Sequence, residues 1–92
     1  MRREHAETVA LQALGWLAAE AELLPVFLSS TGFSADEMRQ RATEPEVLAA
    51  VLDFVTMDDA WVAAFCGAVG LPPEAPMQAR AHLPGGDLPH WT

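Results

Sequence analysis

The chain has one cysteine, no tyrosine and few basic residues among its 92 positions. A lone cysteine, Cys66, cannot form an internal disulfide, so nothing in the sequence indicates an oxidising compartment. The first residues turn acidic where a signal peptide would need an apolar run. No strictly apolar stretch approaches the roughly 20 residues of a membrane-spanning helix. These absences predict a soluble, cytoplasmic protein that does not insert into a membrane.

Basic side chains are outnumbered, with five Lys and Arg against thirteen Asp and Glu, for a formal net charge of −8. Nucleic-acid binders neutralise phosphates with Lys and Arg, so this balance makes nucleic acid an improbable partner. The same negative charge opposes adsorption to anionic membranes. It favours solubility and is compatible with a basic partner, although charge alone identifies none.

Helical patterns fill most of the chain, and no segment alternates polar and apolar residues long enough to predict a strand. Apolar residues recur at helical spacing between turn signals. Gly32 and Gly70 are predicted to end two of the helices in the left-handed conformation, with Phe33 and Leu71 as the apolar residues that follow such caps. The expected helices span about 3–19, 20 or 22 to 31, 34–42, 43–57, 58–69 and 74–82.

Helix starts are marked by capping residues. Ser34 with Glu37, and Thr43 with Glu46, each have the spacing of a capping box, in which side chain and backbone bond reciprocally. Asp58 is predicted to cap the next helix through its carboxylate.

Two further residues constrain the first helices. Pro25 must lie within the first turn or so of its helix, because deeper in it would break a backbone hydrogen bond. Gly15 lies inside a helical pattern, where glycine costs about 1 kcal/mol relative to alanine, so we expect another helix to approach closely there. The proline and glycine spacing at the end of the chain predicts a non-helical tail over 83–92.

The chain also repeats itself at a shift of about 38 residues, which is an architectural signal. Phe27 then aligns with Phe65, and Gly32 with Gly70. We therefore predict an all-α, compact bundle of five to six short helices, built as two similar three-helix units. A single helical domain, 1–92, would contain unit one over about 3–42, unit two over about 43–82 and the tail.

The segment 22–42 has the outline of a DNA-binding helix-turn-helix. Its second helix would present Asp36 and Glu37 to the phosphates at the end where recognition helices read bases. A helical corner with a structural role is therefore the favoured interpretation. A divergent helix-turn-helix regulator is kept as the alternative function.

No catalytic constellation emerges from the residues that could carry chemistry. Cys66 has no neighbouring cation to lower its pKa, so it is expected to be a buried structural residue. The three histidines lack the i, i+4 spacing of a helical zinc site. His82, Asp87 and His90 could bind a metal together only if the tail folded so that their side chains met. The acidic pairs lie at predicted helix starts, where capping and the helix dipole explain them. We predict no enzyme activity, no metal site and no cofactor.

Tryptophans provide the better functional signal. Trp16 and Trp61 lie on apolar stripes and are expected in the core. Trp91 either folds back to close the bundle or is an anchor for a partner. The candidate partner-binding residues are Trp91, Phe33 and Leu71. The predicted function is a non-enzymatic interaction or adaptor module, which holds a helix of an unknown protein partner or a second copy of itself. It would do so through an apolar groove between the two units or through the C-terminal tail.

Three segments carry a resemblance to a known family: ALQALGWLAAEAELLPVFLSSTGF, VLAAVLDFVTMDDAWVAAFCGAVGLPPEAP and LPGGDLPHWT. Together they cover most of the chain. It resembles a family of short, acidic bacterial proteins classed as domain of unknown function 3572. The resemblance implies a free-standing soluble bacterial protein. It transfers no functional residues, because the family has no assigned activity.

Overall fold

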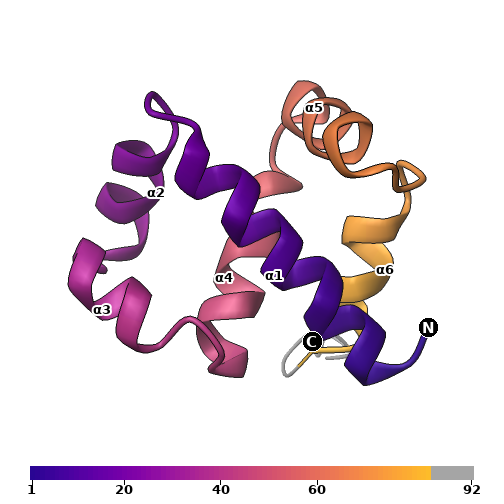
Figure 1. The fold of residues 1–92 in the computed structure, drawn as a ribbon, viewed down its shortest axis with the longest axis horizontal. Helices are drawn as coiled ribbons and strands as arrows, with labels where there is room; N and C mark the ends of the chain where they lie inside the picture. Colours follow the sequence, from indigo (N-terminus) through magenta and orange to yellow (C-terminus); the bar gives the residue numbers. More distant parts are fainter. Residues whose placement is uncertain (84–92) are drawn as a thin grey trace, which may run out of the picture.

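The computed structural model describes residues 1–83, in which six helices surround one core (Figure 1). The helices are α1 (Arg3–Ala19), α2 (Leu24–Thr31), α3 (Ala35–Gln40), α4 (Pro45–Val55), α5 (Asp59–Val69) and α6 (Ala75–Ala81). No strand occurs in this part of the chain. The predicted all-α compact bundle is confirmed.

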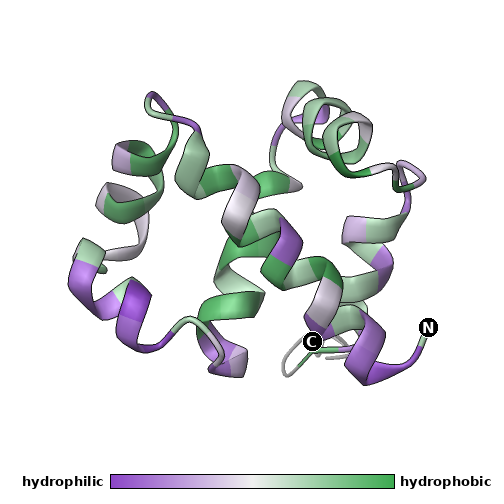
Figure 2. Cartoon of the chain, in the orientation of Figure 1, coloured by the Kyte–Doolittle hydropathy of each residue, from purple (hydrophilic) through white to green (hydrophobic). Residues whose placement is uncertain are grey.

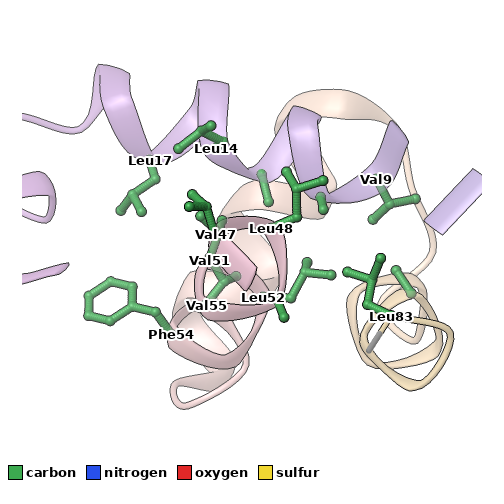
Figure 3. Close-up of a cluster of buried hydrophobic side chains, with 14 of the residues drawn as sticks. Val9, Leu14, Leu17, Val47, Leu48, Val51, Leu52, Phe54, Val55 and Leu83 are labelled. Atoms are coloured by element: carbon green, nitrogen blue, oxygen red, sulfur yellow. The ribbon is translucent and has the colours of Figure 1, made fainter. Parts of the chain in front are cut away.

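The core lies where α1 packs across both α4 and α6. On α1, Ala6, Ala10 and Ala13 have no solvent exposure, and such small side chains allow neighbouring helices to approach closely. Figure 3 shows Leu14 and Leu17 of α1 directed toward the apolar side chains of α4. Seven of the eleven residues of α4 are buried, which makes it the central helix of the bundle: Val47, Leu48, Ala49, Val51, Leu52, Phe54 and Val55.

The caps predicted from glycine, serine and aspartate are confirmed. Gly32 and Gly70 follow α2 and α5 with φ angles of 80° and 76°, in the left-handed region. The hydroxyl of Ser34 accepts a hydrogen bond from the Glu37 N–H, and the Glu37 carboxylate accepts one from the Ser34 N–H, both at 3.1 Å. The Asp58 carboxylate accepts from the Ala60 N–H at 2.8 Å.

The second helix begins later than predicted. Residues 21–23 form a turn, and α2 starts at Leu24 rather than at Glu20 or Glu22. The N–H groups of Leu23 and Leu24 both donate to the Glu20 carbonyl, which closes this turn. Pro25 lies in the first turn of α2, as expected, because its missing N–H leaves no helical bond unmade there.

The predicted capping box of Thr43 with Glu46 is wrong. The N-cap of α4 is Glu44, and no side chain caps this helix. Pro45 occupies the start of α4, and the residue before a proline is driven into extended conformation, so Glu44 takes the cap position. The Glu44 and Glu46 carboxylates instead pair with Arg41, at 2.8 and 3.4 Å.

Among the described residues, no other helix makes the close contact expected at Gly15. Gly15 is exposed, and a Cβ built on it would meet no atom within 4 Å. Gly67, in the middle of α5, has the same open surroundings.

The helices follow one another in the order that the internal repeat predicts, but the third helix of each half packs differently. α6 packs against both α1 and α4, whereas α3 lies at the edge of the bundle (Figure 1). Met38 is the only residue of α3 that is buried. The equivalence of the two units therefore stays a prediction.

Within residues 1–83, no single helix combines the length and the apolar character needed to cross a membrane. α1 and α2 meet that test only as a pair, and the chain bends by 115° between them.

Candidate functional site

Helix α5 is held to the bundle by aromatic contacts on one side. The ring of Trp61 stacks on Phe54 of α4 at a centroid distance of 4.8 Å. Phe65 is fully buried, and its ring lies 6.0 Å from that of Trp16 on α1. Trp16 and Trp61, both expected in the core, are partly buried and packed against it.

The other side of α5 has no neighbour among the described residues. Apart from Asp59 in its first turn, the exposed residues of α5 are Ala60, Ala63, Ala64, Gly67 and Ala68. These five residues are here called the α5 face, and none of them has a polar side chain. Figure 2 shows hydrophobic colouring along most of α5, in contrast to the hydrophilic α3 and the start of α1. A helix that is apolar on all sides is normally buried on all sides. The α5 face is therefore an unpartnered apolar surface.

A groove of about 270 Å³ runs between α5 and α6 along the edge of this face. We call it the α5–α6 groove; it is lined by Thr56, Asp59, Val62, Ala63, Pro73 and Met77. Ala63 belongs to both the groove and the α5 face. The lining residue Met77 is 69% exposed, and Met57, which follows the lining residue Thr56 in the chain, is 75% exposed. Sites for drug-sized ligands usually enclose about 300–1,000 Å³, so this groove suits a single protein side chain better than a cofactor.

The charged residues closest in sequence to most of the groove lining are acidic, and the nearest arginine, Arg80, one turn after Met77, is paired with Asp53. Between Asp53 and Arg80 the chain contains Asp58, Asp59 and Glu74 and no basic residue. Asp59 lines the groove, and Glu74 follows directly on the lining residue Pro73. The whole chain lacks lysine, and its basic residues are five arginines. The α5 face and its groove thus form an apolar surface with a negative border.

Two of the three predicted partner-binding residues, Phe33 and Leu71, do not come together. Phe33 is partly buried at the α2–α3 corner, with its ring 6.2 Å from Phe27 and the Arg41 guanidinium 5.6 Å above it. Leu71 is partly buried at the α5–α6 corner, and its N–H donates to the Cys66 carbonyl. Figure 1 places these corners on opposite sides of the molecule. Trp91 lies outside the described residues.

Cys66 has the surroundings of a structural thiol. It is buried, and its Sγ lies 3.4 Å from the Pro72 carbonyl oxygen. Burial raises the pKa of the Cys66 thiol, and the negative charge of Glu74 raises it further. A thiol nucleophile needs a lowered pKa, which this environment does not provide. The expectation that Cys66 is buried is confirmed.

We expect the stability of the protein to fall in alkaline solution because of Cys66 alone. With no lysine or tyrosine in the chain, no other side chain titrates between about pH 8.5 and 11. The raised pKa of Cys66 keeps it neutral in the folded state while the unfolded thiol ionises. Stability is therefore undiminished below the pKa of the thiol in the unfolded chain. It falls as pH rises from that value through the pKa of the thiol in the folded protein, by at most about 1.4 kcal/mol per pH unit.

Urea unfolding at a series of pH values measures this loss, with Cys66→Ala as the control. The alanine variant should show a flat stability profile over the same alkaline range. An equal decline in both proteins would contradict the assignment.

Metal binding gains no support from the described part of the chain. Residues 1–83 hold no group of three or more His, Cys, Asp or Glu that could bind a metal ion. The exposed His82 has its Nδ1 2.9 Å from the Gln78 carbonyl oxygen. Asp87 and His90, the other two candidate ligands, lie outside the described residues.

The α2–α3 corner has charges unsuited to a DNA groove. Recognition would fall to α3, which has six residues and carries Asp36 and Glu37 in its first turn. Arg39 is paired with Asp36, and Arg41 with Glu44 and Glu46. These arginines are already partnered within the corner, which favours the structural interpretation.

Two structural features could not be predicted from the sequence. The Asp53 carboxylate accepts a hydrogen bond from Arg80 Nε at 2.6 Å, which links α4 to α6. No periodicity connects residues so far apart. The α5–α6 groove was missed because an apolar helix signals burial. The lack of any polar side chain after Asp59 in α5 was the one available clue.

Fold and site together define a small all-α protein with an apolar surface beside α5. The family model described as "Protein of unknown function (DUF3572)" matches residues 3–86, and the chain belongs to this family. The resemblance carried by the three sequence segments is thereby confirmed. No curated protein and no solved structure matches the chain.

Proposed function

We propose that this protein is a non-enzymatic interaction module of the bacterial cytoplasm that docks a helix of a partner protein on α5. The observation that supports the proposal is the exposed α5 face, which adjoins the α5–α6 groove. Apolar surfaces with a polar border are typical of interaction sites. The lone buried Cys66 and the absence of a metal-ligand cluster within residues 1–83 agree with a role that involves no chemistry.

The shape of the surface favours a helix as the docked element. α5 has eleven residues and is about 16 Å long, which matches three turns of a partner helix. Alanine and glycine side chains on the α5 face allow a second helix axis to approach closely. The groove beside Ala63 can then receive one larger side chain from the partner. Helix-in-groove recognition combines a flat apolar surface with a pocket that binds one anchor side chain.

A charged side chain at Ala63 tests the proposal. A photo-crosslinking residue at position 63 is first used in native lysate to identify the bound protein, which is then purified. We expect that partner to bind Ala63→Glu at least tenfold more weakly than the wild type, because the glutamate fills the groove and would be desolvated on binding.

Ser29→Glu is the matched control, since Ser29 is exposed on α2 and gains the same charge away from α5. It should bind the partner as the wild type does. Equal affinity of Ala63→Glu and wild type, or crosslinks from position 29 but none from position 63, would overturn the proposal.

A further inference from the structure

We infer that the partner helix seated on α5 is amphipathic and basic, with Lys or Arg flanking an apolar stripe. This inference rests on the proposed function and specifies the chemistry of its partner. The first argument is the sign of the charge around the surface. Asp59 lines the α5–α6 groove, Asp58 precedes it and Glu74 follows the lining residue Pro73.

Within residues 1–83, none of these acidic groups forms an ion pair with a basic side chain. The segment 54–79, which contains α5 and the whole groove lining, includes no basic residue. Arg80 comes next along the chain and is paired with Asp53 at 2.6 Å. A partner with basic flanks would supply the missing positive charge at the border, and its apolar stripe would cover the α5 face. Complementary charge also accelerates encounter and selects against acidic partners.

A second copy of the chain fits this surface less well. If two α5 faces met across a two-fold axis, both copies would bring acidic borders to the same interface. Like charges brought together at an interface cost several kcal/mol. No lysine or arginine in 54–79 could be exchanged across the axis to compensate. The same argument disfavours any acidic partner segment.

The groove further defines the anchor of the partner helix. Val62, Ala63, Pro73 and Met77 give it apolar walls, and about 270 Å³ accommodates one leucine- or phenylalanine-sized side chain. The exposed Met77 adapts its shape readily, since methionine is unbranched and polarisable. We therefore expect one large apolar residue at the centre of the stripe, with the basic residues one turn away on either side.

Three synthetic helical peptides test the inference. They share one leucine stripe and differ only in their flanking residues, which are lysine, glutamine or glutamate. Titration calorimetry and amide chemical shifts measure their affinity and the place where they bind. We expect the lysine peptide to bind about tenfold more tightly than the glutamine peptide at low salt, and the glutamate peptide not to bind. The advantage should shrink as salt screens the charges.

Variants separate groove docking from general attraction to an acidic protein. Asp59→Asn with Glu74→Gln should reduce the lysine peptide's advantage and leave the affinity of the glutamine peptide unchanged. Ala63→Glu should weaken the lysine peptide, although it adds negative charge. General attraction would instead make Ala63→Glu bind more tightly. Ser29→Glu controls for the added charge on a distant helix. Thermal unfolding by circular dichroism checks that each variant is folded.

The outcomes distinguish this inference from the proposed function. If the glutamine peptide binds at α5 and lysine flanks add nothing, the basic partner is wrong and helix docking stands. If the chain dimerises in sedimentation experiments and Ala63→Glu abolishes the dimer, the occupant is a second copy and the inference fails. If no peptide shifts the α5 amides and the protein is monomeric, both proposals fail.

Discussion

Replacing Phe27 with alanine is expected to lower the free energy of unfolding by about 3–5 kcal/mol. Phe27 has no solvent exposure and packs edge-on against Phe54 of α4 at 5.4 Å. Truncation removes these contacts and leaves a cavity that the surrounding helices close only in part. Such a loss is a large share of the stability of a small domain, so the variant will be partly unfolded at 37 °C. Urea unfolding followed by circular dichroism measures the effect.

Phe65→Ala and Phe33→Ala are the comparison variants for the stability loss expected of Phe27→Ala. Phe65 aligns with Phe27 in the internal repeat and is equally buried, so a similar loss is expected. Phe33 is only partly buried, so its truncation should cost clearly less. A Phe27→Ala loss no larger than that of Phe33→Ala would contradict the assignment of Phe27 to the core. A small effect at Phe65 alone would argue against equivalent units.

Glycine-to-alanine substitutions should change stability with opposite sign at two kinds of position. At Gly70, with a φ of 76°, alanine must adopt the left-handed conformation, which costs about 1–2 kcal/mol. At Gly15, in the exposed middle of α1, alanine should stabilise the helix by about 1 kcal/mol. The two variants make the same chemical change, so their difference isolates the backbone conformation. Chemical denaturation of both variants measures it.

Gly32→Ala and Gly67→Ala are the controls for Gly70→Ala and Gly15→Ala, respectively. Gly32 has a φ of 80° and should behave like Gly70, whereas Gly67 lies in open surroundings within α5 and should behave like Gly15. Neither Gly15 nor Gly67 would meet an atom within 4 Å of an added Cβ. Destabilisation by Gly15→Ala would show that another group approaches this helix after all.

Local signals predicted the helix ends well. Gly32, Gly70, Ser34 and Asp58 act on neighbours within a few residues, so their roles follow from short-range geometry. The predicted capping box of Thr43 with Glu46 was wrong because two local rules competed. Pro45 imposes an extended conformation on Glu44, so the N-cap of α4 is Glu44 and not Thr43. The Glu44 carboxylate pairs with Arg41 and does not cap the helix.

Surface features were harder to predict because they depend on tertiary packing. Nothing in the spacing of Asp53 and Arg80 reveals that α6 lies beside α4. An apolar helix such as α5 indicates burial, and only the packed structure shows that Ala60, Ala63 and Ala64 stay exposed. Phe33 and Leu71, both predicted as binding candidates, are partly buried and pack against the core.

The contact of α1 with α6 also sets the order in which the chain can fold. Ala6 and Val9, near the start, share one core with Ala79 and Leu83. During synthesis, α1 therefore leaves the ribosome long before the helix that completes its packing. Such distant pairings slow folding, because the intervening chain must close into a loop first. α1 and α4 can associate early, but the core closes only after α6 has been made.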